Sequence, residues 1–348
     1  MQAAVFRGTG MPLSLESFPL PELQPGEALV RITCATICGS DLHTLAGRRT
    51  APVPTVLGHE MVGIIAAAGE GLQFQTGERV TWSVILHCGE CFYCQRGLEP
   101  KCERLLKFGH QRLEPGRELL GGMAEYCWLP KGTSIFRVPP QVPDIVASPA
   151  NCATATVAAV LRQAGPLNGQ TVTIHGAGML GLTACAMAKT RGAAQVIAIE
   201  PNAERRAMAS RFGATATLAP DSKLRDSVLH LSGGRGSDLA LDFAGHPDVL
   251  ETGLSLLRTG GHFVLAGAVF PAGAANIAPE QIVRRMLRIT GVHNYSPQDL
   301  GAALEFLGAA GMQYPFAELV PVAFPLPEVN AAVEYANRVR PPRVALLP

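Results

Sequence analysis

The sequence predicts an α/β protein with a β-rich domain followed by a doubly wound parallel sheet. Three observations predict this fold class. Short β-branched runs broken by Pro and Gly fill the first half, helical and strand segments alternate from about Ala147 onward, and a glycine-rich turn separates a strand from a helix at 176–181. The length agrees, because 348 residues suit about two domains at ~150 residues each.

Each half has its own pattern of elements. In the first half we expect a compact, mostly antiparallel domain with strands over 28–33, 61–66, 79–85 and 124–129. In the second half we expect strands over 171–175, 195–199, 239–243 and 262–266, with helices over 180–191 and 204–212. The tail from about Asn294 should form a helix over 300–307, continue as proline-rich extended chain and return to the first domain.

Composition excludes several classes of protein. With 47% hydrophobic and 16% charged residues the chain can bury a large core, and its net charge of +1 attracts neither nucleic acid nor an anionic membrane. The N-terminus reads directly as a strand rather than a signal peptide, and no apolar run reaches the ~18 residues of a membrane span. Nine cysteines suit a reducing compartment, so we expect a cytoplasmic protein.

Four cysteines at C-x2-C-x2-C-x7-C spacing predict a structural zinc lobe over residues 86–103. They are Cys88, Cys91, Cys94 and Cys102. Zn²⁺ takes four thiolates in a tetrahedron and then has no open coordination position, so such a site stabilises the chain and does no chemistry. A disulfide set is the alternative, but the first three cysteines are too close in sequence to pair comfortably. The low net charge argues against a nucleic-acid-binding zinc module.

A glycine-rich turn that opens a helix directly after a strand predicts a dinucleotide site. The turn reads Gly176-Ala-Gly178-Met179-Leu180-Gly181. Its glycines allow a tight turn and close approach of a pyrophosphate, which the helix N-terminus then binds. Glu200 follows 19 residues after Gly181, where an acid accepts hydrogen bonds from the ribose hydroxyls and repels a 2′-phosphate. We therefore expect NAD rather than NADP, although Arg205 and Arg206 can tolerate a 2′-phosphate and Glu200 can instead be a solvated strand end.

Two short motifs extend the pattern to a second metal site: Cys38-Gly-Ser40-Asp41-Leu-His43 and Gly58-His59-Glu60. Alone, Cys38 reads as a small buried hydrophobe and His59 as a structural histidine. Together with the zinc lobe, the glycine turn and the two-domain layout, they resemble the zinc-dependent medium-chain alcohol dehydrogenases over essentially the whole chain. The resemblance implies a GroES-like catalytic domain over 1–153, an NAD-binding Rossmann domain over 154–293, and a return segment over 294–348.

The resemblance also implies a ligand set for a catalytic zinc: Cys38, His59 and Cys152, which makes two zinc ions per chain. Glu60 then resembles an acid that exchanges onto the metal, or else a carboxylate beside it. Asp41 resembles the carboxylate that orients a ligating histidine.

Four further residues correspond to family positions near the substrate and cofactor. Ser40 and His43 resemble the relay that carries the alcohol proton to solvent, and Thr156 matches a residue that lies against the nicotinamide. Arg343 sits where the family often places a contact to the cofactor phosphates, or is a surface arginine of a terminal strand.

The implied activity is reversible hydride transfer from a primary or secondary alcohol to NAD⁺ in a homodimer or homotetramer. A polyol, amino-alcohol or threonine-type dehydrogenase is the alternative within the family. From another class, a non-catalytic zinc-stabilised dinucleotide-binding protein is the alternative.

Three stretches of the sequence bear on the substrate. The stretches 121–125, 148–156 and 176–183 look like a subgroup of dehydrogenases associated with phosphonate catabolism, which suggests a hydroxyalkyl phosphonate or another anionic alcohol. Arg48 and Arg49 form a candidate anion clamp, or a solvated basic loop or subunit contact, and Lys107 and His110 are further candidates.

Overall fold

The computed structural model describes residues 1–348, which divide into two compact units. The first unit contains Met1–Ala155, Ser296–Ala309 and Phe316–Pro348, and the second contains Thr156–Tyr295 and Ala310–Pro315. The sequence assigned 310–315 to the return segment. The structure instead places them with the second unit, where the Tyr314 ring stacks on Phe212 at a centroid distance of 6.1 Å.

The first unit is built on a seven-stranded sheet, as the short β-branched runs predict. Its order is β10 (Ile135–Arg137), β6 (Arg79–Trp82), β5 (Glu60–Ala68), β3 (Ala28–Ile37), β18 (Val344–Leu347) and β17 (Ala323–Pro325), with β9 (Tyr126–Leu129) also paired to β3. Only β17 and β18 run parallel. Because β18 pairs with β3 in the register Val344 to Ile37, the end of the chain completes this unit.

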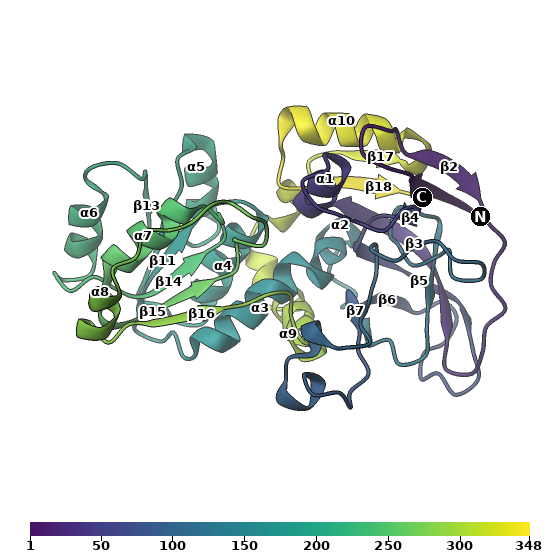
Figure 1. The fold of residues 1–348 in the computed structure, drawn as a ribbon, viewed down its shortest axis with the longest axis horizontal. Coiled ribbons are helices and arrows are strands. Elements are labelled where there is room, and N and C mark those ends of the chain that lie inside the picture. Colours follow the sequence, from purple (N-terminus) through teal and green to yellow (C-terminus); the bar gives the residue numbers. More distant parts are fainter. The chain divides into compact units, whose positions relative to one another are not determined.

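Smaller elements surround this sheet (Figure 1). A three-stranded sheet has the order β2 (Ser14–Ser17), β1 (Gln2–Phe6) and β4 (Thr55–Val56), and a two-stranded ribbon joins β7 (Ile85–Leu86) to β8 (Leu106–Lys107). The helical segments are α1 (Gly39–Leu45), η1 (Cys94–Arg96), η2 (Glu99–Lys101), α2 (Asp144–Ala147), η3 (Ser148–Asn151), α9 (Pro297–Gly308), η5 (Phe316–Leu319), η6 (Leu326–Glu328) and α10 (Val329–Val339).

The helix α10 corrects the expectation of extended chain after the helix predicted over 300–307. Prolines lie before it, at 321, 325 and 327, and after it, at 341 and 342, so the 11 residues of the helix itself are free of proline. Val329, Ala332 and Ala336 recur at helical spacing and are buried against the first unit's core. The prolines therefore delimit a helix rather than prevent one.

The second unit is a six-stranded parallel sheet, which confirms the predicted fold class. Its order is β13 (Ala216–Leu218), β12 (Gln195–Ile199), β11 (Thr171–His175), β14 (Ser237–Asp242), β15 (Leu257–Leu265) and β16 (Arg288–Gly291). The connecting helices are α3 (Ala153–Ala164), α4 (Met179–Thr190), α5 (Ala203–Arg211), α6 (Leu224–Leu231), α7 (Pro247–Leu256) and α8 (Pro279–Arg284), with η4 (Ala310–Gln313).

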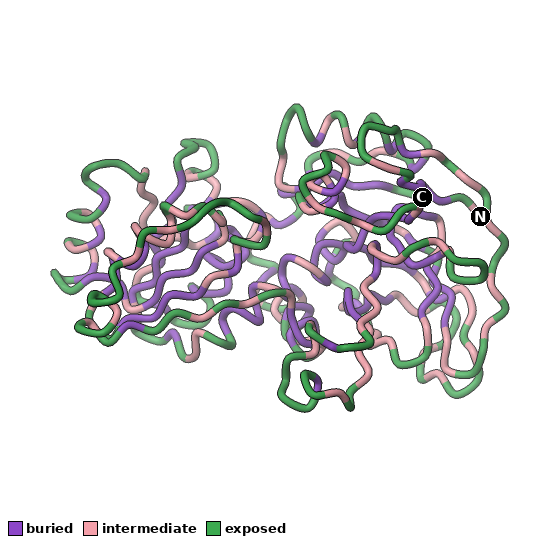
Figure 2. Tube along the Cα trace, viewed as in Figure 1, coloured by how far each residue is buried: buried purple, intermediate pink, exposed green.

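The strand order reverses direction between β11 and β14, and this point defines where a ligand binds. In an open parallel sheet, the loops that leave two such strands diverge and create a crevice at the carboxyl ends. Figure 2 shows the central strands of the sheet as buried, and all five residues of β11 are buried. Since residues of both faces are buried, β11 is covered on both sides, and four of its five residues are β-branched threonine, valine or isoleucine, which favour a strand.

No single helix has the length and apolar character that a membrane span requires. One bent pair, Asp144–Asn151 followed by Ala153–Ala164, passes the same test of length and composition.

Candidate functional site

Four potential metal ligands gather in the first unit, and we call them the Cys38 cluster: Cys38, His59, Glu60 and Cys152. Their ligand atoms all lie within 4.8 Å of one another. Cys38 lies between β3 and α1, His59 and Glu60 lie at the start of β5, and Cys152 directly follows η3. Two adjacent strands and a helical turn thus bring together residues separated by up to 114 positions.

The Asp41 carboxylate lies against one ring nitrogen of His59. The Asp41 Oδ1 atom lies 3.2 Å from His59 Nδ1, although the geometry falls short of a hydrogen bond, and Asp41 Oδ2 accepts the Cys38 backbone N–H at 2.9 Å. Although burial opposes the charged imidazole, Asp41 raises the pKa of His59 to about 10. A carboxylate on one ring nitrogen is the usual way to direct the other nitrogen at a metal. His59 Nε2 is that other nitrogen, and it lies 3.3 Å from Ser40 Oγ.

The two thiols of the cluster are matched to a cation. A hydrogen bond from Cys152 lowers the pKa of Cys38 well below its usual value, and against the effect of burial the charges of Arg343 and His59 lower it further. The pKa of Cys152 rises correspondingly, because the two sulfurs share one proton. Two thiols and an imidazole are the donors that Zn²⁺ prefers, so the residues present fit a zinc ion.

Glu60 and Arg343 form a buried ion pair beside the thiols. Arg343 Nε and Nη2 each donate to a Glu60 oxygen at 2.6 Å, and Thr36 Oγ1 donates to the same carboxylate at 2.7 Å. Arg343 Nη2 also lies 3.5 Å from Cys38 Sγ. The resemblance implied a phosphate contact for Arg343 or a surface position. The structure rules out the surface position, since the residue is only 5% exposed, and the phosphate contact stays a prediction.

His43 lies on α1, one helical turn after Ser40 and its hydroxyl. The Arg48 Nε–H donates to His43 Nδ1 at 2.8 Å. Burial lowers the pKa of His43, and the charge of Arg48 lowers it further. Because an arginine can only donate, His43 here carries its proton on Nε2 and must lose the Arg48 hydrogen bond before it accepts another.

The structure gives the two predicted clamp arginines different surroundings. Arg48 is exposed and bound to His43, whereas Arg49 is half-buried and interacts electrostatically with Asp41 and the two cluster thiols. Lys107 is half-buried and interacts with Arg49 and with the same acid and thiols. The His110 ring lies 5.4 Å from that of His59.

The lobe cysteines Cys88, Cys91, Cys94 and Cys102 form a second group whose sulfur atoms all lie within 4.8 Å of one another. None of them forms a disulfide. The sulfurs of Cys88 and Cys94 are 3.9 Å apart, close to the edge of about 3.8 Å that a tetrahedron has when its metal–sulfur distances are about 2.3 Å. Backbone N–H groups also face these sulfurs, and that of Glu90 contributes most to a pKa of about 6 for Cys88. The group fits a zinc ion with no open position.

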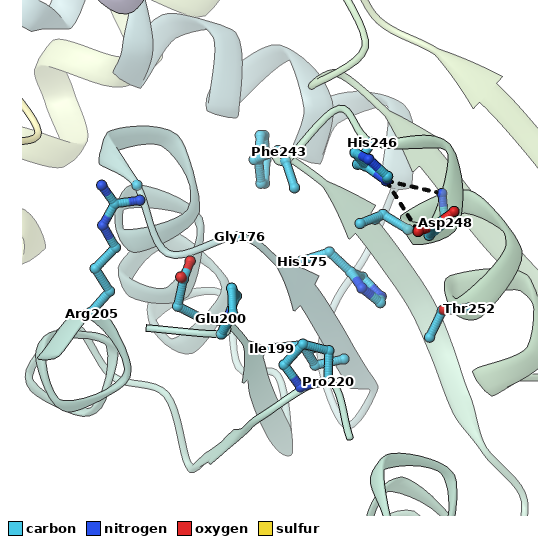
Figure 3. Close-up of a pocket in the computed structure, with 14 residues that line it drawn as sticks. His175, Gly176, Ile199, Glu200, Arg205, Pro220, Phe243, His246, Asp248 and Thr252 are labelled. Carbon is cyan, nitrogen blue, oxygen red and sulfur yellow. Dashed lines mark hydrogen bonds and ion pairs between the residues drawn. The ribbon is translucent and has the colours of Figure 1, made fainter. Parts of the chain in front are cut away.

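A pocket of about 720 Å³ lies at the carboxyl ends of the second unit's strands (Figure 3). Gly176, Gly178, Glu200 and Arg205 line it, as the sequence predicts for a dinucleotide site. The turn requires glycine at 181, since a Cβ there would meet the Gly176 carbonyl oxygen at 1.8 Å. Met179 and Leu180 begin α4 above this turn.

Glu200 supports the turn as well as facing the pocket. Its Oε2 accepts the Ala177 N–H at 2.8 Å and its Oε1 accepts the Asn202 N–H at 3.0 Å. Asn202 caps α5 by accepting the Arg205 N–H. Each carboxylate oxygen has a second lone pair, so Glu200 can still accept a ribose hydroxyl.

Other lining residues were not predicted: Phe243, His246, Asp248 and Thr252. They follow β14, across the reversal point from the glycine turn, and Figure 3 shows Phe243 and His246 opposite Glu200 and Arg205. The sequence signal that could have identified them is their position at the end of the predicted strand 239–243 or after it. Thr156 lies on α3 and does not line the pocket, and its contact with a nicotinamide stays a prediction.

Comparison with known sequences identifies both units. Residues 24–140 match the family described as "Alcohol dehydrogenase GroES-like domain", and residues 180–309 match "Zinc-binding dehydrogenase". L-threonine 3-dehydrogenase of Pyrococcus horikoshii is 32% identical over 290 residues, which cover 81% of this chain and 80% of that protein. 5-exo-hydroxycamphor dehydrogenase of Pseudomonas putida is 29% identical over 330 residues, which cover 91% of this chain and 90% of that protein.

Solved structures with the same fold cover all of this chain and 99% of theirs. An alcohol dehydrogenase from Thermotoga maritima matches with a TM-score of 0.93 at 27% identity. A zinc-binding dehydrogenase from Sinorhizobium meliloti 1021 bound to NADP matches with a TM-score of 0.89 at 26% identity. An alcohol dehydrogenase from E. coli CFT073 complexed with NADH matches with a TM-score of 0.87 at 26% identity.

Proposed function

The chain belongs to the zinc-binding medium-chain alcohol dehydrogenase family and is an oxidoreductase, and from this premise we propose that it is a two-zinc enzyme that transfers hydride reversibly between an alcohol and NAD⁺. The observation that carries the proposal is the Cys38 cluster. It combines two thiols and an imidazole, the ligand types of a catalytic zinc, with a carboxylate behind the imidazole.

In this proposal Cys38, His59 and Cys152 hold the catalytic zinc, and the lobe cysteines hold a structural zinc. When bound, the catalytic ion supplies Lewis acidity that lowers the pKa of an alcohol hydroxyl. Asp41 orients His59, and the Arg343 guanidinium holds Glu60 at the edge of the cluster.

Ser40 and His43 are proposed to move the alcohol proton. Ser40 Oγ lies 3.3 Å from His59 Nε2, so it stands at the edge of the ligand set and can take a proton from a hydroxyl there. His43 is proposed as the next acceptor, on the solvent side of α1, once its Nδ1 loses the hydrogen bond from Arg48. Burial lowers the pKa of His43, which favours its release of the proton to water.

We propose NAD rather than NADP as the cofactor. The glycine turn presents backbone N–H groups and a helix N-terminus to the pyrophosphate, while Glu200 places a carboxylate in the pocket, where it would repel a 2′-phosphate. Arg205 also lines the pocket and is the reason for measuring both cofactors. A kcat/KM higher with NADP⁺ than with NAD⁺ overturns this assignment.

The proposed substrate is a primary or secondary alcohol, with anionic alcohols favoured because Arg49 and Lys107 stand beside the cluster. A hydroxyalkyl phosphonate belongs to that class, although none of the relatives named above is named for a phosphonate. The L-threonine 3-dehydrogenase of Pyrococcus horikoshii makes an amino alcohol the competing substrate.

The proposal is tested by metal analysis together with NAD⁺ reduction across neutral, polyol, amino, carboxylate and phosphonate alcohols. We expect two zinc ions per chain and alcohol-dependent NADH formation. Cys38→Ser should abolish turnover while NADH binding persists, and Cys185→Ala, which alters a buried thiol of α4, should leave both unchanged. One zinc per chain with no alcohol oxidised would instead favour a non-catalytic dinucleotide-binding protein.

The proposal extends to assembly and location. Val283 of α8, Ile289 of the edge strand β16 and Met286 between these elements are exposed, which suits a homodimer or homotetramer joined through this unit. Light scattering tests this assembly. Nine unpaired thiols support a reducing compartment such as the cytoplasm.

A further inference from the structure

Two cationic side chains beside the Cys38 cluster have no direct contact with an anionic group. Neither Arg49 nor Lys107 forms an ion pair, and both are half-buried. Burial therefore removes part of their hydration, and only the longer-range attraction of Asp41 and the cluster thiols compensates for it, a costly arrangement for a lysine or arginine. Buried cations normally have an anionic partner, so two cations without an ion pair beside a reaction site indicate a ligand that supplies the missing negative charge.

The backbone holds Lys107 next to the cluster. Lys107 pairs with Ile85 in the β7–β8 ribbon, and its carbonyl accepts the His110 N–H at 3.2 Å. The turn that follows packs directly on the residue before His59, because a Cβ at Gly109 would lie only 2.4 Å from the Gly58 carbonyl oxygen. The segment from Lys107 to His110 is thus part of the wall around His59.

Arg49 approaches the same place from α1. It follows Arg48, whose backbone N–H donates to the His43 carbonyl at 2.9 Å, so the chain is still tied to the helix at this point. Like charge from Arg49 contributes, after burial, to lowering the pKa of Lys107 to about 8. Both cations act on the same acid and thiols of the cluster, and an anion bound by both would reduce the repulsion between them.

The charges around the cluster indicate the sign of the charge that a ligand should carry. Two thiolates neutralise a zinc ion, and Glu60 neutralises Arg343. Of the remaining charged groups that are buried or half-buried, Asp41 contributes −1, while Arg49 and Lys107 contribute +2; Arg48 is exposed to solvent, which screens its charge. The surroundings are left with a net charge of +1, which favours a substrate that carries a negative group.

We propose that Lys107 and Arg49 form the binding site for the anionic group, a carboxylate or a phosphonate, of a short alcohol whose hydroxyl lies at the Cys38 cluster. The inference rests on the proposed dehydrogenase function and makes its substrate class specific. It replaces the Arg48–Arg49 clamp with a pair drawn from two separate segments, because Arg48 is bound to His43. Lysine supplies a point charge and arginine a planar fork, and both suit either oxyanion.

The test compares three primary alcohols that share a hydroxyethyl group: 2-hydroxyethylphosphonate, 3-hydroxypropionate and 1-propanol. Each is titrated calorimetrically into the zinc-loaded protein with NADH bound, and NAD⁺ reduction is measured separately. The variants are Lys107→Gln and Arg49→Gln. The matched controls are Lys131→Gln and Arg31→Gln, which remove the same charges from exposed positions of the first unit.

We expect at least one of the two anions to bind about tenfold or more tightly than 1-propanol, and each site variant to weaken that binding about 10- to 100-fold. Binding of 1-propanol and the control variants should be unaffected. The anion that responds identifies the carboxylate or phosphonate source. Anions that bind no more tightly than 1-propanol, or as tightly to both site variants as to the wild type, overturn the inference.

Failure of the proposed function has a different signature. Oxidation of 1-propanol without any preference for the anions overturns the inference and leaves the dehydrogenase assignment intact. Anion binding that depends on Lys107, with no NADH formed from any alcohol, supports the anion site and overturns the assignment.

Discussion

The buried ion pair between Glu60 and Arg343 should stabilise the first unit substantially. Glu60 is fully buried, the Arg343 side chain is 6% exposed, and both hydrogen bonds are 2.6 Å long. Removing one member leaves the other charge uncompensated away from water, at a cost of about 3–5 kcal/mol. We therefore expect Arg343→Met to lower the free energy of unfolding by about 3 kcal/mol or more.

Chemical unfolding followed by tryptophan emission measures this loss of stability in the first unit, where the ion pair lies. The chain has two tryptophans, Trp82 and Trp128, and both are buried in the first unit. Zinc content is measured on the same samples, so that a change in metal loading is not mistaken for a change in packing.

A matched surface pair provides the control for this experiment. Arg137 pairs with Glu78 at 2.9 Å, but its side chain is 60% exposed, so Arg137→Met should cost under about 1 kcal/mol. The double variant Glu60→Gln with Arg343→Met should lose less than the sum of the two single losses, because no lone charge then remains. A loss for Arg343→Met no larger than that for Arg137→Met would refute the reasoning.

Three further outcomes follow from the other sites. Cys94→Ala should remove one of two zinc ions and lower the melting temperature, with zinc content and a thermal melt as the readouts; an unchanged metal count would contradict the lobe assignment. Glu200→Gln should raise the KM for NAD⁺ about tenfold. It should also reduce the preference for NAD⁺ over NADP⁺, since a neutral amide no longer repels the 2′-phosphate. An unchanged ratio of the kcat/KM values for the two cofactors would contradict this role of Glu200. Burial and the charge of Arg49 lower the pKa of Lys107 to about 8, although the cluster thiols and Asp41 act in the opposite direction. Lys107 therefore keeps its charge below pH 8 and loses it above pH 8. The KM of an anionic alcohol should then rise up to about tenfold per pH unit above 8, while that of 1-propanol stays flat; parallel profiles would contradict the role of Lys107.

The sequence alone predicted those features that depend on short spacing. The lobe cysteines lie within 15 residues and the glycine turn within six, so turn geometry by itself brings their atoms together. The strands 171–175 and 195–199 were predicted at their observed bounds, because β-branched residues between turn signals mark a strand. The helix α10 was missed because prolines on both sides were read as extended chain.

Only the tertiary structure decided the contacts between distant segments. Arg343 reaches Glu60 across 283 residues because β18 pairs with β3, which in turn pairs with β5. The tertiary structure also gives two adjacent residues different partners. Arg48 donates a hydrogen bond to His43, whereas Arg49 interacts electrostatically with Lys107, which belongs to the β7–β8 ribbon. Spacing along the chain determines which ligands a turn can gather, but strand pairing determines which charges meet, and the proposed preference for an anionic alcohol depends on those charges.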